Sequence, residues 1–189
     1  SSTSRGLGDV YKRQIRILAN FGTRHTLSDT LSETRGIGAA RRWIKSEFES
    51  ISKNCGNCLD VFYQKNYFTP KDGDRIVKPV WINNVLAIQR GKIHPNRFII
   101  MSGDIDSRIS DPTNYTDDSP GANDNASGMA GTIEAARVLS EYTFNNSILY
   151  VGLAGEEQGL FGGKGLAKHA KEKDWEIIGI LNNDMIGNI

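Results

Sequence analysis

The chain has 189 residues, 38% of them hydrophobic, and counting glycine with the apolar residues while leaving out tyrosine gives roughly 46% apolar content, as in ordinary folded domains. This composition excludes a disordered chain. The 23 basic and 22 acidic residues leave a net charge of +1 without a basic stripe, so no nucleic-acid partner is expected. The longest nearly apolar run is far short of the roughly 20 residues that span a bilayer, so no membrane span is expected either.

The first 14 residues have no apolar periodicity, no starting methionine and no recognisable secretory signal. They resemble translated adapter sequence, and we expect residues 1–14 to be a non-native leader outside the fold. The domain is therefore expected to occupy residues 15–189.

An amphipathic helix is predicted over residues 33–51, where apolar residues recur every three or four positions. Residues 59–68 and 80–88 follow as strands, the second interrupted by Asn83 and Asn84. The turn signal Asp72-Gly73 between them indicates an antiparallel pair.

The second half alternates strands and helices in a βαβαβ order, which is typical of a parallel sheet. The chain ends just after the last strand, and we expect it to be a C-terminally truncated, incomplete part of a larger single α/β domain. The expected strands and helices are 97–101, 126–142, 147–154, 160–173 and 176–181.

Four side features have simple interpretations. The C-x-x-C pair Cys55 and Cys58 lacks the second pair that a zinc knuckle needs, which favours a small surface disulfide or two free thiols over a redox centre. Trp43 and Trp81 are assigned to core or interface packing. The loop 111–118 is expected to be solvated, with the rim of a substrate entrance as the alternative.

Acidic residues follow all three predicted parallel strands. Ligands of open parallel sheets bind beyond the carboxyl ends of the strands, so these side chains are expected to converge. The set is Asp104 and Asp106 after the first strand, Asp124 at the start of the next helix, Glu156 and Glu157 after the second strand, and Asp184 after the third.

Six carboxylates in one crevice would repel one another unless cations neutralised them, which favours a metal centre. For Asp124 alone, helix capping competes with metal binding. Neighbouring side chains in an extended loop point in different directions, so of Glu156 and Glu157 one could bind metal while the other acts as a general base.

These motifs resemble the co-catalytic di-zinc aminopeptidases of metallopeptidase family twenty-eight, relatives of leucyl aminopeptidases, glutamate carboxypeptidases and glutaminyl cyclases. The resemblance runs from about residue 21 to 189 and is strongest in GDIDS, PGANDNASG, AGEEQGLFGG and NNDMIG. It implies a three-layer α/β/α zinc-exopeptidase-like (phosphorylase/hydrolase-like) fold with a mixed, mostly parallel central sheet.

The resemblance also implies roles for the acidic residues. Asp124 matches the carboxylate that bridges two zinc ions, Glu157 a ligand of one ion, and Asp184 a ligand of the other. Asp104 takes the place of that ion's histidine. Glu156 matches the general base, and Asp106 the acid that orients the ligand at position 104.

Two departures from the family pattern bear on the metal. Aspartate at position 104 adds charge and an oxygen donor, which shifts preference from Zn²⁺ toward Mn²⁺ or Mg²⁺ and leaves no ring N–H for Asp106 to orient. The family's last histidine ligand lies beyond the end of this chain. His25, His94 and His169 are not in a matching context, and the last two are interpreted as surface residues, so we expect an incomplete metal shell and weak activity.

The sequence therefore predicts a metal-dependent aminopeptidase acting on peptides, with an apolar pocket for the substrate side chain. A glutaminyl cyclase-like aminoacyltransferase and a catalytically weakened peptide-binding domain remain alternatives. Export to the periplasm or the extracellular space is expected, because relatives are commonly exported and a disulfide fits an oxidising compartment. The oligomeric state and the preferred substrate residue stay open.

Overall fold

The structure is a computed structural model that describes residues 3–187. Four helices, a short irregular turn at Ala122–Ser127 and five strands make up the described part. The helices are α1 (Thr3–Ala19), α2 (Gly36–Asn54), α3 (Gly128–Leu139) and α4 (Phe161–Glu172), and the strands are β1 (Leu59–Phe68), β2 (Val80–Gln89), β3 (His94–Asp104), β4 (Asn146–Leu153) and β5 (Glu176–Asn183).

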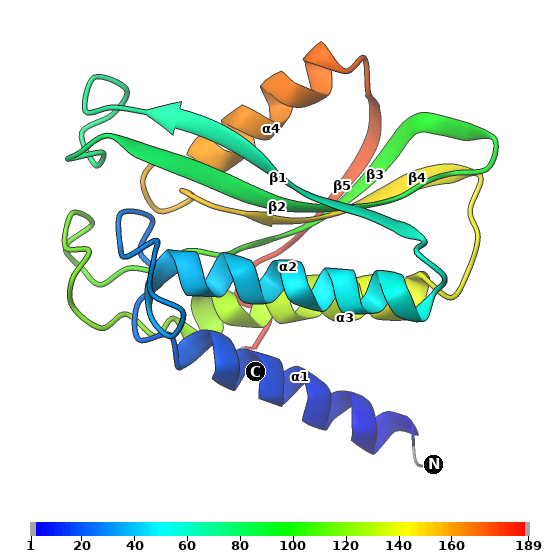
Figure 1. Cartoon of the computed structure of the whole chain (residues 1–189), viewed down its shortest axis with the longest axis horizontal. Coiled ribbons are helices and arrows are strands. Elements are labelled where there is room, and N and C mark those ends of the chain that lie inside the picture. Colours follow the sequence, from blue (N-terminus) through cyan, green and yellow to red (C-terminus); the bar gives the residue numbers. More distant parts are fainter. Residues whose placement is uncertain (1–2, 188–189) are drawn as a thin grey trace.

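The five strands form one mixed sheet in the order β1-β2-β4-β3-β5. Strand β3 pairs in parallel with both β4 and β5, which confirms the predicted βαβαβ unit. The β1–β2 and β2–β4 pairs are antiparallel, so the predicted hairpin is also confirmed. Helices α2 and α3 cover one face and α4 the other, while α1 lies beneath α3 (Figure 1). This is the expected three-layer α/β/α fold.

The main core lies between the sheet and helices α2 and α3. The apolar face of α2 supplies Ile44 and Phe48, which are fully buried in one cluster with Ile133 of α3 and Tyr150 of β4. Strands β2 and β4 are buried on both faces, which explains their almost continuous apolar runs. A smaller cluster beneath α4 includes Leu166.

The two edges of the sheet differ in chemistry. Strand β1 carries Asp60 and Lys65 along its length. Strand β5 is exposed over most of its residues, and Ile180 and Leu181 are 63% and 57% exposed. The β5 edge is therefore both unpaired and apolar in the part of the chain that the structure describes.

Helix α1 places the described part of the predicted leader against the domain, while its non-native origin stays a prediction. It runs without interruption from Thr3 to Ala19, and Tyr11 and Gln14 donate hydrogen bonds to the Ser127 carbonyl and the Glu134 carboxylate. Two glycines and the lack of a regular apolar stripe in its first turns hid this helix in the sequence. Residues 1 and 2 of the predicted leader lie outside the described residues.

Smaller differences concern single residues. Asn83 and Asn84 do not interrupt β2. Cys55 and Cys58 form a disulfide just after α2, one of the two states expected for them. Trp81 is 56% exposed and contacts the tilted ring of Tyr67, which contradicts core packing and leaves interface packing untested, whereas Trp43 packs against the main core.

Candidate metal centre

The parallel strands bring their carboxyl ends to one edge of the sheet, and the predicted acidic residues follow those ends. Asp104 is the last residue of β3 and is 7% exposed. Burial, together with the charges of Asp106, Glu156 and Asp184, raises its pKa to about 7. Residues from three strand ends thus act on one carboxylate, as the sequence predicted.

Glu156 shows the same coupling from the loop after β4. Burial is the main cause of its raised pKa of about 7, and Asp106, Glu157, Asp124 and Asp184 add to it. A carboxylate with such a pKa is half protonated near neutral pH, where a general base or acid works best. This property had no visible signal in the sequence.

Asp106 ties together two loops at the site. Its Oδ1 accepts a hydrogen bond from the Glu156 amide at 3.2 Å, and its Oδ2 accepts from the Glu157 amide at 3.1 Å and from Thr26 Oγ1 at 2.9 Å. Burial nevertheless raises the pKa of Asp106. The bonds of Asp106 hold the loop that carries both glutamates, and in the described residues none of them reaches the side chain of Asp104.

Glu157 forms an ion pair with Arg108, whose Nε lies 2.5 Å from Oε2. Burial raises the pKa of Glu157, and the bond from Arg108 opposes that shift. The Glu157 carbonyl also accepts a hydrogen bond from Arg75 at 2.7 Å. Arg108 thus occupies the carboxylate that the family resemblance assigns to a metal ion.

Asp124 and Asp184 are the two exposed members of the set. Asp124 lies in the irregular turn before α3 and is joined to Asn125 by a cis peptide bond. Asp184 follows β5 directly. Their charges reach the buried carboxylates, since both raise the pKa of Glu156.

Asn125 fixes the geometry between the strand ends, a role that the sequence did not predict. Its Nδ2 donates to Asp104 Oδ2 at 3.2 Å and to the Asn183 carbonyl at 2.9 Å. Its Oδ1 accepts from the amides of Gly128 and Met185, both at 3.1 Å. One buried amide therefore connects the ends of β3 and β5 with the start of α3.

Asn84 performs a similar function on the other side of the site. It accepts from the Ala154 amide at 3.0 Å and donates to the Gly162 carbonyl at 2.9 Å, which holds both ends of the loop containing Glu156 and Glu157. A Cβ on Gly162 would lie 2.1 Å from the Ala154 carbonyl oxygen, so the loop can close this tightly only with glycine there.

Arg24 is a second residue that sequence reasoning missed. It is 1% exposed and donates to four backbone carbonyls, at distances of 2.6–3.0 Å. Burial lowers its pKa to about 10, against the charges of Asp106 and Asp124. The acceptors are Leu18, Ile105, Pro120 and Gly121, so the guanidinium connects α1 to the segments beside Asp104 and Asp124.

Of the three histidines, only His25 lies beside the acidic loops, where its Nε2 is 3.1 Å from Gln158 Nε2 and the charge of Glu157 acts on it. His25 is fully buried, and its Nε2 lies 3.0 Å from the Pro112 carbonyl. His94 is exposed, as expected. His169 is half-buried between Phe62 and Trp175, which corrects its interpretation as a plain surface residue.

Within residues 3–187, no group of three or more His, Cys, Asp or Glu side chains is arranged closely enough to hold a metal ion. The chemistry of the donor set still fits a divalent cation. The carboxylates lie near enough to raise one another's pKa, and a cation would relieve that repulsion. Oxygen donors of this kind suit hard cations as well as zinc.

A comparison with known families decides the affiliation, because the sequence profile of "Peptidase family M28" matches residues 84–189, more than half of the chain. The chain belongs to peptidase family M28. The match covers Asp104, Asp106, Asp124 and the residues of the two later loops. The resemblance drawn from the four motifs is thereby confirmed.

Curated M28 relatives extend the similarity toward the N-terminus. A "Probable zinc metalloprotease" of Pyrenophora teres f. teres is 40% identical over 180 residues, which cover 95% of this chain and 39% of that protein. A protein of the same name from Pyricularia oryzae is 41% identical over 186 residues, covering 96% of this chain and 37% of the relative. The chain thus spans about two fifths of the length of these relatives.

Solved structures agree with the M28 fold. LapA of Legionella pneumophila superposes with a TM-score of 0.71 at 23% identity, over 94% of this chain and 43% of that one. A glutaminyl cyclase of Fimbriiglobus ruber gives a TM-score of 0.69 at 18% identity, over 91% and 59% of the two chains. At these identities the likeness concerns the fold alone.

Proposed function

We propose that this chain forms part of the catalytic domain of a metal-dependent aminopeptidase. The observation that carries the proposal is the position of Glu156, a half-buried carboxylate whose loop is held by Asp106 beside the other acidic residues. The M28 relatives are named probable zinc metalloproteases, which supports the hydrolytic chemistry. An aminopeptidase of the same family among the solved structures, from Legionella pneumophila, supports action on N-terminal residues.

Four carboxylates would hold the metal, namely Asp104, Asp124, Glu157 and Asp184, and we propose a two-zinc site that also accepts Mn²⁺ or Mg²⁺ because of Asp104. Bound metal would polarise the scissile carbonyl and lower the pKa of water. Glu157 would exchange its ion pair with the exposed Arg108 for the cation.

The remaining steps belong to the chain's own residues. Glu156 takes a proton from the attacking water and returns it to the leaving amine. Asp106 keeps Glu156 in place through its bonds to the two loop amides. A base with a pKa near the working pH performs both transfers efficiently.

The test uses Glu156→Gln in the full-length protein, with the exposed Glu141→Gln as matched control. Glu156→Gln should retain zinc, measured by elemental mass spectrometry, and lose about 10²–10⁴-fold of its aminoacyl-anilide hydrolysis. Glu141→Gln should match the wild type. Retained hydrolysis in Glu156→Gln would reject the assigned base, and pyroglutamate formation without hydrolysis by the wild type would assign a cyclase instead.

We also propose that the protein is exported, which the Cys55–Cys58 disulfide supports because such bonds persist in oxidising compartments. Mass spectrometry of protein isolated under thiol-trapping conditions tests this. Two trapped thiols would contradict it. No helix within residues 3–187 has the length and apolar character to cross a membrane.

A further inference from the structure

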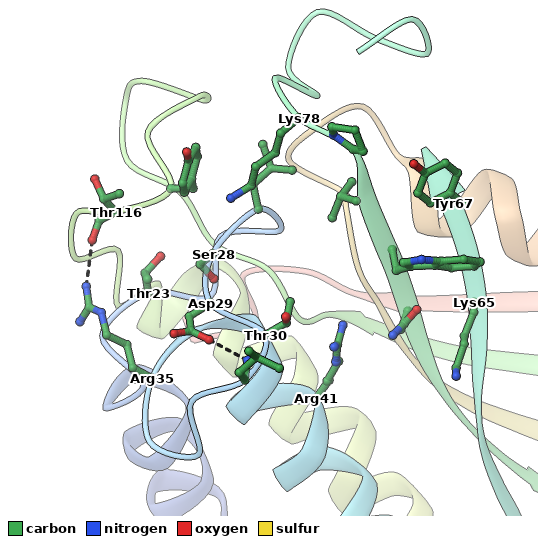
Figure 2. Close-up of a pocket in the computed structure, with 17 residues that line it drawn as sticks. Thr23, Ser28, Asp29, Thr30, Arg35, Arg41, Lys65, Tyr67, Lys78 and Thr116 are labelled. Atoms are coloured by element: carbon green, nitrogen blue, oxygen red, sulfur yellow. Dashed lines mark hydrogen bonds between the residues drawn. The ribbon is translucent and has the colours of Figure 1, made fainter. Parts of the chain in front are cut away.

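A cavity of about 900 Å³ opens at the same end of the sheet as the acidic residues, yet none of the six carboxylates lines it. Figure 2 shows its walls, with Arg41 rising from α2, Lys65 from β1 and Lys78 from the segment before β2. Neither the family comparisons nor the proposed chemistry uses this space.

The charge of the cavity is strongly positive. Four basic side chains and one acidic side chain line it. Arg35 is paired with Asp118, and the acidic residue, Asp29, accepts hydrogen bonds from the Leu31 and Ser32 amides. The other three cations, Arg41, Lys65 and Lys78, have no acidic partner among the residues that the structure describes.

Arg41 has the most unmet bonding capacity of the three. It is half-buried, and across residues 3–187 its guanidinium makes no hydrogen bond, although the group has five N–H donors. Burial lowers the pKa of Arg41, the nearby Tyr63 opposes that shift, and Arg42 adds to it. A half-buried guanidinium without a partner is poised to bind an anion, and its planar fork matches a carboxylate.

Asn83 supplies a second, independent feature. It lines the cavity, is 8% exposed, and its Oδ1 has no hydrogen-bond partner in the described part of the chain. A buried acceptor without a donor costs free energy, so a hydrogen bond from an N–H group of a ligand to Asn83 Oδ1 would remove that cost. A peptide backbone supplies such an N–H group together with a carboxylate, whereas a simple phosphodiester supplies no N–H group.

Aromatic rings complete the wall. Trp81 and Tyr67 contact each other at a tilt, with their ring centres 5.1 Å apart, and are 56% and 53% exposed. The Lys78 ammonium lies 3.7 Å from the centre of the Tyr115 ring, which holds that cation at the rim. These rings offer apolar contact beside the cations.

The cavity is connected to the acidic site by one short segment. Thr26 donates to Asp106, while Thr23, Leu27 and Ser28 on either side of it line the cavity. A ligand that occupies the cavity therefore lies against the same loop that supports Asp106.

We propose that this cavity binds a carboxylate-bearing segment of a peptide. Arg41 pairs with the carboxylate, Lys65 and Lys78 add positive charge, and Asn83 accepts a backbone N–H. The choice of a peptide over other carboxylates rests on the proposed peptidase function together with the free Asn83 acceptor.

The experiment measures binding of three N-acetylated tetrapeptides to this chain by tryptophan fluorescence and calorimetry. One peptide carries two glutamates and an amidated C-terminus, the second has glutamines instead, and the third is the glutamine peptide with a free C-terminal carboxylate. At least one carboxylate-bearing peptide should bind at least tenfold more tightly than the neutral one. Comparing the affinities of the two carboxylate-bearing peptides shows whether the cavity prefers a side-chain or a terminal carboxylate. Trp81→Phe should abolish the fluorescence change.

Arg41→Gln should weaken that binding at least fivefold, and Arg41→Lys should weaken it less. Lys78→Gln provides a second variant should Arg41→Gln lose its fold, judged by circular dichroism. Lys92→Gln, an exposed lysine outside the cavity, is the matched control and should bind like the wild type. Equal affinity for all three peptides, no binding of any, or binding unaffected by both cavity variants would overturn the proposal.

Blocked N-termini prevent hydrolysis by an aminopeptidase, so this test is independent of activity. Binding without hydrolysis of unblocked peptides by the full-length protein would count against the proposed function only. Hydrolysis without binding in the cavity would count against this inference only.

Discussion

Arg24→Met is expected to destabilise the protein by at least about 3 kcal/mol. Four bonds from a charged donor to buried carbonyls, at the lower value of roughly 1.5 kcal/mol each, amount to about 6 kcal/mol. Removing the charge also removes the free-energy cost of burying it, about 3 kcal/mol, because burial lowers the pKa of Arg24 from 12.5 to about 10. The difference is the predicted loss.

Urea unfolding of the wild type and the variant at pH 7, followed by circular dichroism, measures this loss directly. Arg90→Met is the matched control, since Arg90 makes one exposed ion pair with Asp60 and should contribute less than about 1 kcal/mol. A loss below 1 kcal/mol for Arg24→Met, with an unchanged m-value, would refute the assignment of Arg24 as the link between the segments.

Four further predictions concern the acidic site and the disulfide. In metal-free protein, Asp104 and Glu156 have folded pKa values of about 7 against ordinary values of 3.8 and 4.5. The folded state therefore holds protons more tightly, and its stability falls as the pH rises from about 4 to about 7. Melting temperatures measured in chelator across this range check the prediction, and a flat profile would contradict it. Zinc should raise the melting temperature most at the upper end, and an equal rise at pH 5 and pH 7.5 would count against these groups as its site. The Cys55–Cys58 disulfide closes only a short loop, so its reduction should lower the free energy of unfolding in urea by about 2 kcal/mol. Asp106→Asn replaces one acceptor oxygen with a donor facing a backbone amide, so it should weaken zinc binding in equilibrium dialysis more than Asp60→Asn does.

The sequence predicted the site's acidic residues because their positions follow from strand order. Each of Asp104, Glu156 and Asp184 comes at or just after a β-strand, and parallel strands must bring those ends together. The strands and the other helices were equally accessible, because apolar periodicity is a local property, whereas α1 lacks a regular apolar stripe in its first turns.

The links between these residues could not be predicted in the same way. Arg24 and Asn125 look like ordinary polar residues in the sequence, and their bonds join segments about 100 and 60 positions apart. Core packing of Trp81 could not be distinguished from an exposed position, because hydrophobicity alone does not say which face of a strand is covered. Its face of β2 borders the cavity.

The open edge at β5 has a practical consequence for anyone handling this chain. Its unpaired backbone groups and the exposed side chains of Ile180 and Leu181 form a template to which another strand can add. The residues from Ile177 to Leu181 include no charged side chain that would oppose such pairing, whereas strand β1 at the opposite edge carries Asp60 and Lys65. In concentrated solution the chain should therefore self-associate through β5, and Ile180→Lys should reduce this self-association.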